Sequence, residues 1–243
     1  MATPLIVVPP LTLWNGNGEV DCGATAAYAQ LAALTWIDLF MLSGSIGEGK
    51  TSSPSARRRT LEIWAEHVPK ERLFACVWSS ADYPYLKELG VRPVVVLQEL
   101  KDISALLKLL ANIPAGSFIY SHPEYSATTF SPSVAEQAVN AGLLPSGAKI
   151  SKISLADIHK MRSVVGDRFL LFDGRCRHIE ASVKAGATGV VVVPFCLIPR
   201  DLPDRTELVK LQTMIDETQA LVDREGGVAA QARMLTGLLR ARI

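Results

Sequence analysis

The stretch GVVVV, residues 189–193, is apolar at every position. A strand with one solvated face alternates apolar and polar residues, so a continuous run indicates that both faces are buried. This is typical of a parallel sheet covered by helices. Pro194 ends the run far short of the roughly 20 apolar residues that a membrane helix needs, so we expect a strand here and no membrane contact.

Seven similar runs come earlier in the chain, at residues 5–8, 37–42, 73–78, 93–97, 117–120, 148–153 and 169–172. Segments of helical length separate them. Two of these segments open with Ser before Pro, at Ser53 and Ser131, which is typical of a helix start. Eight strand-helix units in 243 residues predict the α/β class and a (β/α)8 TIM barrel, which typically has about 250 residues.

We expect a single domain over residues 1–243. In this prediction, residues 1–203 carry the eight strands and most helices, and residues 204–243 carry the closing helix and one additional C-terminal helix. An open doubly wound sheet is the alternative. No G-x-G-x-x-G follows the first run, and NGNGEVD, residues 15–21, is better read as a turn, so a dinucleotide-binding fold is disfavoured.

Charge and cysteine content limit the function classes. The net charge is +1, which provides no long-range field for nucleic acid. Four cysteines, Cys22, Cys76, Cys176 and Cys196, have no C-x-x-C spacing, and the first residues lack the basic region of a secretion signal. We therefore expect buried reduced thiols, a cytoplasmic location, and a small molecule as ligand.

In barrels of this kind the chemistry lies at the carboxyl ends of the strands. In AKISKIS, residues 148–154, side-chain alternation puts Lys152 on the face of Ala148 and Ile150, with Lys149 on the opposite face. A serine and an acid three residues apart, Ser154 and Asp157, resemble a capping box that opens the next helix. Lys152 is therefore expected in the barrel mouth, where a desolvated amine can form a Schiff base. The alternative is that Lys152 reaches solvent or pairs with an acid and that Lys149 is an ordinary surface lysine.

Three other strand ends carry candidate groups. Tyr120 in FIYSHP could relay protons, or it could be a half-buried rim aromatic. The turn SGSIGEG, residues 43–49, could present backbone N–H groups to a carboxylate or phosphate, although glycine and serine are common in any turn. Asp173 and Arg175 follow another strand, and Arg175 could hold a carboxylate bidentately or be a solvated loop residue.

Together these segments resemble the dihydrodipicolinate synthase and N-acetylneuraminate lyase family, the pyruvate-dependent class I aldolases. GSIGEG is similar to the family's G-[ST]-T-G-E, YSHP to its Y-N-x-P, and KISLAD to its K-[DE]-x-S-G-D. The segments TSSPSARRRTLEI, GATGVVVVPFCLIP and PLTLWNGNGEVD also resemble family segments, in the same order along most of the chain.

The resemblance implies a role for each matched residue. Lys152 corresponds to the Schiff-base lysine, Tyr120 to the proton-relay tyrosine, and Gly44-Ser45-Ile46 to the pocket for the carboxylate of a 2-oxo acid. It also implies carbon-carbon bond formation between that 2-oxo acid and an aldehyde, or the reverse cleavage, with neither a metal nor an organic cofactor.

The departures from the family pattern bear on the substrate. Ile46 stands where a second hydroxyl residue is usual, and Tyr125 where the named synthase has an arginine for its aldehyde substrate. Cys196 replaces an asparagine, the run at 92–102 lacks a P-Y-Y segment with the tyrosine lent across a subunit interface, and the chain is shorter than usual. These differences argue against the synthase's own aldehyde.

Two functions remain open from the sequence. The first is an active lyase or aldolase acting on a 2-oxo acid. The second is a catalytically degenerate barrel that binds a small metabolite or a protein partner. The family resemblance also implies assembly as a homo-oligomer, either a dimer or a tetramer.

Overall fold

The structure is a computed structural model that describes residues 3–174 and 177–243. Parallel strands follow one another in the order β1 to β8 in a closed barrel, with helices between them, which confirms the predicted (β/α)8 class. The chain divides into two compact units. The first unit is Met1–Leu5 with Pro93–Val191, and the second is Ile6–Arg92 with Val192–Ile243. That residues 1–243 form one domain stays a prediction.

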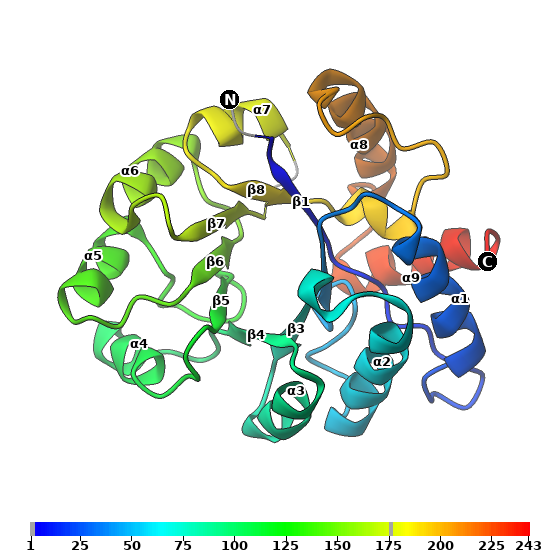
Figure 1. Cartoon of the computed structure of the whole chain (residues 1–243), viewed down its shortest axis with the longest axis horizontal. Coiled ribbons are helices and arrows are strands. Elements are labelled where there is room, and N and C mark those ends of the chain that lie inside the picture. The colour runs from blue at the N-terminus through cyan, green and yellow to red at the C-terminus, as the bar shows by residue number, and fades with distance from the viewer. Residues whose placement is uncertain (1–2, 175–176) are drawn as a thin grey trace. The chain divides into compact units, whose positions relative to one another are not determined.

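The first unit carries strands β4 to β8 and the helices between them. In chain order these are β4 (Arg92–Val96), α4 (Ile103–Leu110), β5 (Phe118–Ser121), α5 (Pro132–Asn140), β6 (Gly147–Ile150), α6 (Leu155–Val165), β7 (Leu170–Asp173), α7 (Ile179–Lys184) and β8 (Gly189–Val191). In Figure 1 these strands lie side by side, with α4, α5 and α6 along one side of them. Nearly every strand residue is buried, as continuous apolar runs predict.

Two predicted helix starts in this unit are confirmed by their caps. The Ser131 hydroxyl accepts a hydrogen bond from the N–H of Val134, and α5 begins at the next residue, Pro132. The Ser154 hydroxyl accepts from the N–H of Asp157 at 3.0 Å, and α6 begins at Leu155. Each cap satisfies one of the N–H groups that a helix start leaves without an intrahelical partner.

The second unit carries the remaining strands and helices. They are β1 (Leu5–Val8), α1 (Cys22–Ala33), β2 (Leu39–Leu42), α2 (Pro54–His67), η1 (Lys70–Arg72), β3 (Leu73–Val77), η2 (Ser80–Asp82), α3 (Tyr83–Leu89), η3 (Val193–Leu197), α8 (Leu208–Val222) and α9 (Val228–Arg240). Helix α2 starts after Ser53, as predicted, and α9 is the predicted additional C-terminal helix.

Aromatic packing joins α1, α2 and β2 in the second unit. The Tyr28 and Trp64 rings meet edge to face at 5.2 Å between centroids, and Phe40 also lies 5.2 Å from Trp64. All three side chains are fully buried, and such pairs add about 0.5–1.5 kcal/mol beyond their area of burial. This packing fixes the position of the strand β2 from which the glycine-rich turn emerges.

Candidate active site

Lys149 and Tyr120 form the centre of the candidate site in the first unit. They lie opposite each other on the paired parallel strands β6 and β5. The Lys149 Nζ atom lies 3.8 Å from the centroid of the Tyr120 ring, a cation–π geometry. Lys149 is only 6% exposed and Tyr120 only 1% exposed, and within the described residues Lys149 has no carboxylate partner. A buried amine without an ion pair is costly for a fold, so its place here points to function.

The small residue two positions before the lysine is required by packing. A Cβ atom on Gly147 would lie 2.3 Å from a ring carbon of Phe118, which shares a strand face with Tyr120. The Phe118 ring in turn stacks on Phe172 of β7 at 6.2 Å. Gly147 therefore leaves room for the Phe118 ring. Two residues later along β6, the Lys149 amine lies beside Tyr120, the next aromatic residue on the same face of β5.

Lys152 does not lie on strand β6, where the alternation of side chains predicts it. Strand β6 ends at Ile150, and Lys152 lies in the following turn with a φ of 60°, in the left-handed region. Its side chain is 62% exposed, and its Nζ lies 3.0 Å from a Glu124 carboxylate oxygen. This hydrogen bond is the main cause of the lowered pKa of Glu124. The structure thus corrects the predicted position of Lys152 and the description of Lys149 as a surface lysine.

Lys152 does border a cavity of about 180 Å3 in the first unit. Phe130, Ile150 and Asp157 are also in its wall. This volume is below the roughly 300 Å3 at which small-molecule pockets usually begin. The exposed ion pair with Glu124 matches the alternative recognised in the sequence, a lysine that pairs with an acid.

Aromatic side chains from the loop after β5 surround Tyr120. The Tyr125 ring packs edge to face on Tyr120 at 6.0 Å, and so does the His122 ring, also at 6.0 Å. His122 and Tyr125 lie 5.1 Å apart. The Ser121 hydroxyl accepts a hydrogen bond from the N–H of Phe130 at 2.9 Å, which holds the two ends of this loop together. Tyr125, predicted to contact substrate, therefore lies next to the predicted catalytic tyrosine.

Sequence reasoning assigned no role to His122, although it belongs to the YSHP segment. The N–H of Glu124 donates to its Nδ1 at 3.1 Å. Burial lowers the pKa of the half-buried imidazole, and this is the largest of the effects on it. A titratable ring in contact with the candidate tyrosine is a signal for function that only the structure supplies.

Asp173 lies opposite Ile150 of β6 in the strand register. Asp173 ends β7, is buried, and accepts a hydrogen bond from the Ser182 hydroxyl of α7, so it joins that strand to the following helix. Arg175 lies outside the described residues.

The Gly44-Ser45-Ile46 turn belongs to the second unit and follows β2. The N–H of Gly49 donates to the Gly44 carbonyl, and the N–H of Glu48 to the Ser45 carbonyl, each at 3.0 Å. The Ile46 side chain is buried. The segment is therefore a closed, hydrogen-bonded turn, in which Ile46 contributes packing where the aldolase family usually has a hydroxyl.

Two glycines of this turn are required because other atoms approach closely. A Cβ on Gly47 would lie 2.6 Å from the Pro10 carbonyl oxygen. A Cβ on Gly49 would lie 1.9 Å from the Ser43 carbonyl oxygen and 2.3 Å from Nε1 of Trp78. These close contacts explain why positions 47 and 49 are glycines, and no ligand is needed for that explanation. The two glycines alone are therefore no argument for an anion site.

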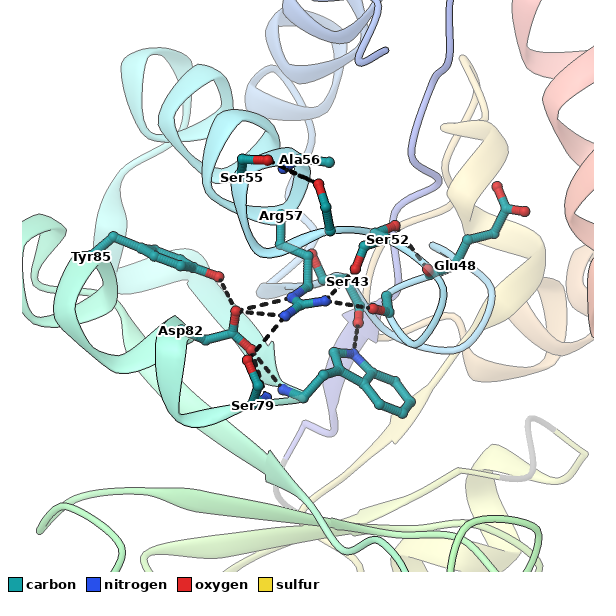
Figure 2. A network of polar contacts seen from close by, with 12 residues as sticks. Ser43, Glu48, Ser52, Ser55, Ala56, Arg57, Ser79, Asp82 and Tyr85 are labelled. Atoms are coloured by element: carbon teal, nitrogen blue, oxygen red, sulfur yellow. Dashed lines mark hydrogen bonds and ion pairs between the residues drawn. The ribbon is translucent and has the colours of Figure 1, made fainter. Parts of the chain in front are cut away.

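A buried arginine, which sequence reasoning missed, ties this turn to the loop after β3 (Figure 2). Arg57 donates to the carbonyls of Gly49 and Ser52 and, through Nε and Nη2, to one oxygen of Asp82 at 3.0 and 2.8 Å. Both charged side chains are almost wholly buried. Asp82 also accepts from the Tyr85 hydroxyl, and burial, followed by the charge of Asp82, raises the pKa of Tyr85. The network fixes the conformation of the turn.

Neither a metal cluster nor a membrane helix is found among the described residues. Across residues 3–174 and 177–243, no three or more His, Cys, Asp or Glu side chains gather as metal ligands. None of the helices in these ranges combines the length and the apolar character needed to cross a bilayer.

Comparison with known proteins supports the fold. No protein-family model and no curated protein matches the sequence. Among solved structures, 2-keto-3-deoxygluconate aldolase from Picrophilus torridus matches with a TM-score of 0.80 at 17% identity, over 98% of this chain and 93% of its own. Dihydrodipicolinate synthase from Bacillus anthracis matches with a TM-score of 0.67 at 17% identity, over 98% and 81%.

A third match is the sialic acid aldolase from Ruminococcus gnavus, in a variant of its catalytic lysine. Its TM-score is 0.72 at 14% identity, over 96% of this chain and 76% of its own. At these identities the likeness concerns the fold. The resemblance to the dihydrodipicolinate synthase and N-acetylneuraminate lyase family is thus confirmed at the level of the fold.

Proposed function

We propose that this protein is a class I aldolase or lyase that forms a Schiff base between Lys149 and pyruvate or a related 2-oxo acid. The observation that carries the proposal is the buried Lys149 amine above the Tyr120 ring. The fold shared with sialic acid aldolase and 2-keto-3-deoxygluconate aldolase supports the same chemistry. The role that the sequence suggested for Lys152 passes in this proposal to Lys149.

The proposed reaction begins when the Lys149 ammonium gives up a proton and the resulting amine attacks the ketone carbon of the 2-oxo acid. The carbinolamine that forms loses water to give an imine, and loss of a proton from the neighbouring carbon gives an enamine. This carbon then bonds to the carbonyl carbon of an aldehyde. Water finally hydrolyses the imine, releases the product and restores the amine, and the reverse sequence is the cleavage reaction.

Tyr120 is proposed to move protons during imine formation. Its ring lies against the amine, and a tyrosine hydroxyl can both donate and accept a proton. Binding of the carboxylate by the Gly44-Ser45-Ile46 turn stays a prediction from the sequence. Substrate contacts by Tyr125, Asp173 and Arg175, and assembly as a homo-oligomer, stay predictions.

Reductive trapping tests this function. The protein is incubated with pyruvate, borohydride is added, and the adduct is located by peptide fragmentation in a mass spectrometer. We expect the label on Lys149, its loss in Lys149→Ala, and its retention in the matched variant Lys152→Ala. A label on Lys152 would return the role to the residue that the sequence suggested. A folded protein that is not labelled by any short 2-oxo acid would favour a catalytically degenerate barrel.

A further inference from the structure

The imidazole of His122 is held in one protonation state by its hydrogen bond. Its Nδ1 accepts the backbone N–H of Glu124 at 3.1 Å. A backbone N–H can only donate, so Nδ1 carries no proton, and the neutral ring must carry its proton on Nε2. Among the described residues Nε2 has no hydrogen-bond partner. The structure therefore contains a fixed N–H donor that is unused within the described protein.

The surroundings favour the neutral form of this ring. Burial lowers the pKa of His122, and the charges of Lys149 and Lys152 lower it further, whereas the charge of Glu124 raises it. Glu124 is itself paired with Lys152 at 3.0 Å. A histidine that stays neutral cannot readily give up its Nε2 proton, but it can donate a strong hydrogen bond, as a neutral histidine does in triosephosphate isomerase.

His122 also lies where a second substrate would be expected. Its ring centroid is 6.0 Å from that of Tyr120, and the Lys149 Nζ is 3.8 Å from the same point. Together these two distances set an upper limit of about 10 Å between the amine and the imidazole. A three-carbon acid bound to the amine as an imine extends about 4–5 Å from Nζ at ordinary bond lengths. An aldehyde that adds to the far end of this acid therefore lies within the distance that separates the amine from the imidazole.

Resting on the proposed function, we propose that Nε2 of His122 binds the oxygen of an uncharged aldehyde and stabilises the alkoxide formed on it. When the enamine carbon bonds to the aldehyde carbon, the carbonyl π pair moves onto oxygen. The alkoxide accepts a hydrogen bond from Nε2–H and then takes up a proton equivalent to the one lost in enamine formation. The imidazole begins and ends neutral, and the addition involves no net change in protons.

The aldehyde is proposed to be uncharged because the described side chains of this cluster offer it no unpaired cation. Lys149 is consumed in the imine, and Lys152 is already paired with Glu124. Tyr120, His122 and Tyr125 provide hydroxyl groups and an imidazole but no guanidinium group. A carboxylate on the aldehyde would lose its hydration without gaining a counter-charge from this cluster.

Separating the partial reactions tests this role. Wild type, His122→Leu, His122→Gln and the control His159→Gln, altered at an exposed α6 residue, are compared in three assays. These are trapping of pyruvate on Lys149, exchange of pyruvate methyl protons with solvent, and addition of pyruvate to glycolaldehyde or glyceraldehyde. We expect trapping and exchange to stay within about twofold in every variant.

Only the addition step should depend on His122. We expect it to fall roughly 100- to 1,000-fold in His122→Leu, the effect of losing one donor to an oxyanion, and to recover at least partly in His122→Gln, whose amide still donates. Unchanged addition in His122→Leu, with trapping intact, would overturn this role and leave the proposed function standing. The role of His122 would also be overturned if the wild-type protein traps pyruvate but accepts only carboxylated aldehydes such as glyoxylate, or accepts no aldehyde at all. The proposed function would still stand in that case. Absence of trapping in wild type would instead refute the proposed function itself.

Discussion

The Lys149 ammonium lies 3.8 Å above the centre of the Tyr120 ring, and the strand register places the two residues directly opposite each other. Removing a charge from water costs several kcal/mol, and a desolvated cation–π contact returns only about 2 kcal/mol. We therefore expect Lys149→Met to raise stability by about 1 kcal/mol while it abolishes trapping by pyruvate. Calorimetry would show a midpoint about 2–4 °C higher.

The matched control for this variant is Lys152→Met. The Lys152 side chain is 62% exposed, so its replacement should change stability by less than about 0.5 kcal/mol and leave trapping intact. A midpoint several degrees lower in Lys149→Met would mean that the buried amine stabilises the fold, which is opposite to our expectation.

Tyr120→Phe keeps the ring beneath the amine and removes only the hydroxyl. If that hydroxyl moves protons in imine formation, the rate of trapping should fall roughly 100- to 10,000-fold. The control is Tyr28→Phe, because the buried Tyr28 hydroxyl donates to the Cys196 carbonyl in the second unit. This control should lose about 1 kcal/mol of stability and keep its trapping rate. Equal trapping rates in the two variants would remove Tyr120 from the mechanism.

The fold could be predicted from the sequence, because continuous apolar runs separated by capped helices allow few other arrangements. The position of the buried lysine proposed to form the Schiff base could not. Both faces of a parallel strand are buried, so Ala148 and Ile150, which are both buried, do not reveal which face carries the site. The strand also ends at Ile150, three residues before the predicted end at Ile153, and this puts Lys152 in a turn.

Other parts of the site depend on contacts between distant segments. The backbone N–H of Glu124 fixes the His122 ring through a hydrogen bond, and no pattern of side chains in the sequence predicts such a bond. Arg57 lies in the run Arg57-Arg58-Arg59, and nothing in the sequence distinguishes the buried arginine from its two exposed neighbours. The roles of both residues become visible only when their partners are in place.

Acidification should expose the lowered pKa of His122. The unfolded chain has an ordinary histidine pKa near 6.5 and takes up its proton first, so the stability contributed by the neutral ring is lost as the pH falls below about 6.5. We expect His122→Gln to lose less stability than wild type between pH 7 and pH 5, measured by urea denaturation, with His159→Gln as control. The lowered pKa of Glu124 acts separately, because its contribution is lost only near and below about pH 4.3. Identical losses in wild type and His122→Gln would contradict a neutral, half-buried imidazole.

Gly49→Ala should be among the most disruptive small changes in the chain. The new methyl group would overlap the Ser43 carbonyl oxygen and Nε1 of Trp78, at 1.9 and 2.3 Å. We expect a loss of about 3 kcal/mol or more, or failure to fold, by thermal denaturation. Gly237→Ala in α9 is the matched change, since nothing lies within 4 Å of its added carbon. It should gain about 1 kcal/mol through helix propensity, and a tolerated Gly49→Ala would show that the turn is looser than these contacts imply.

Arg57→Met tests whether the buried network holds the turn after β2 in place. The variant leaves Asp82 buried without its counter-charge and leaves the carbonyls of Gly49 and Ser52 without this donor, so stability should fall by about 3–5 kcal/mol. The control is Arg58→Met on the same helix. Its ion pair with Glu62 is largely exposed and should contribute less than about 1 kcal/mol.

Limited proteolysis then separates loosening of the turn from a general loss of stability. Trypsin can cut after the exposed Lys50, which lies in the segment that Arg57 ties down. At equal unfolded fractions, adjusted with urea, cleavage at Lys50 should be faster in Arg57→Met than in Arg58→Met, because only the former frees the turn locally. Equal cleavage rates would mean that the turn keeps its conformation without the arginine, through its own hydrogen bonds from Glu48 and Gly49.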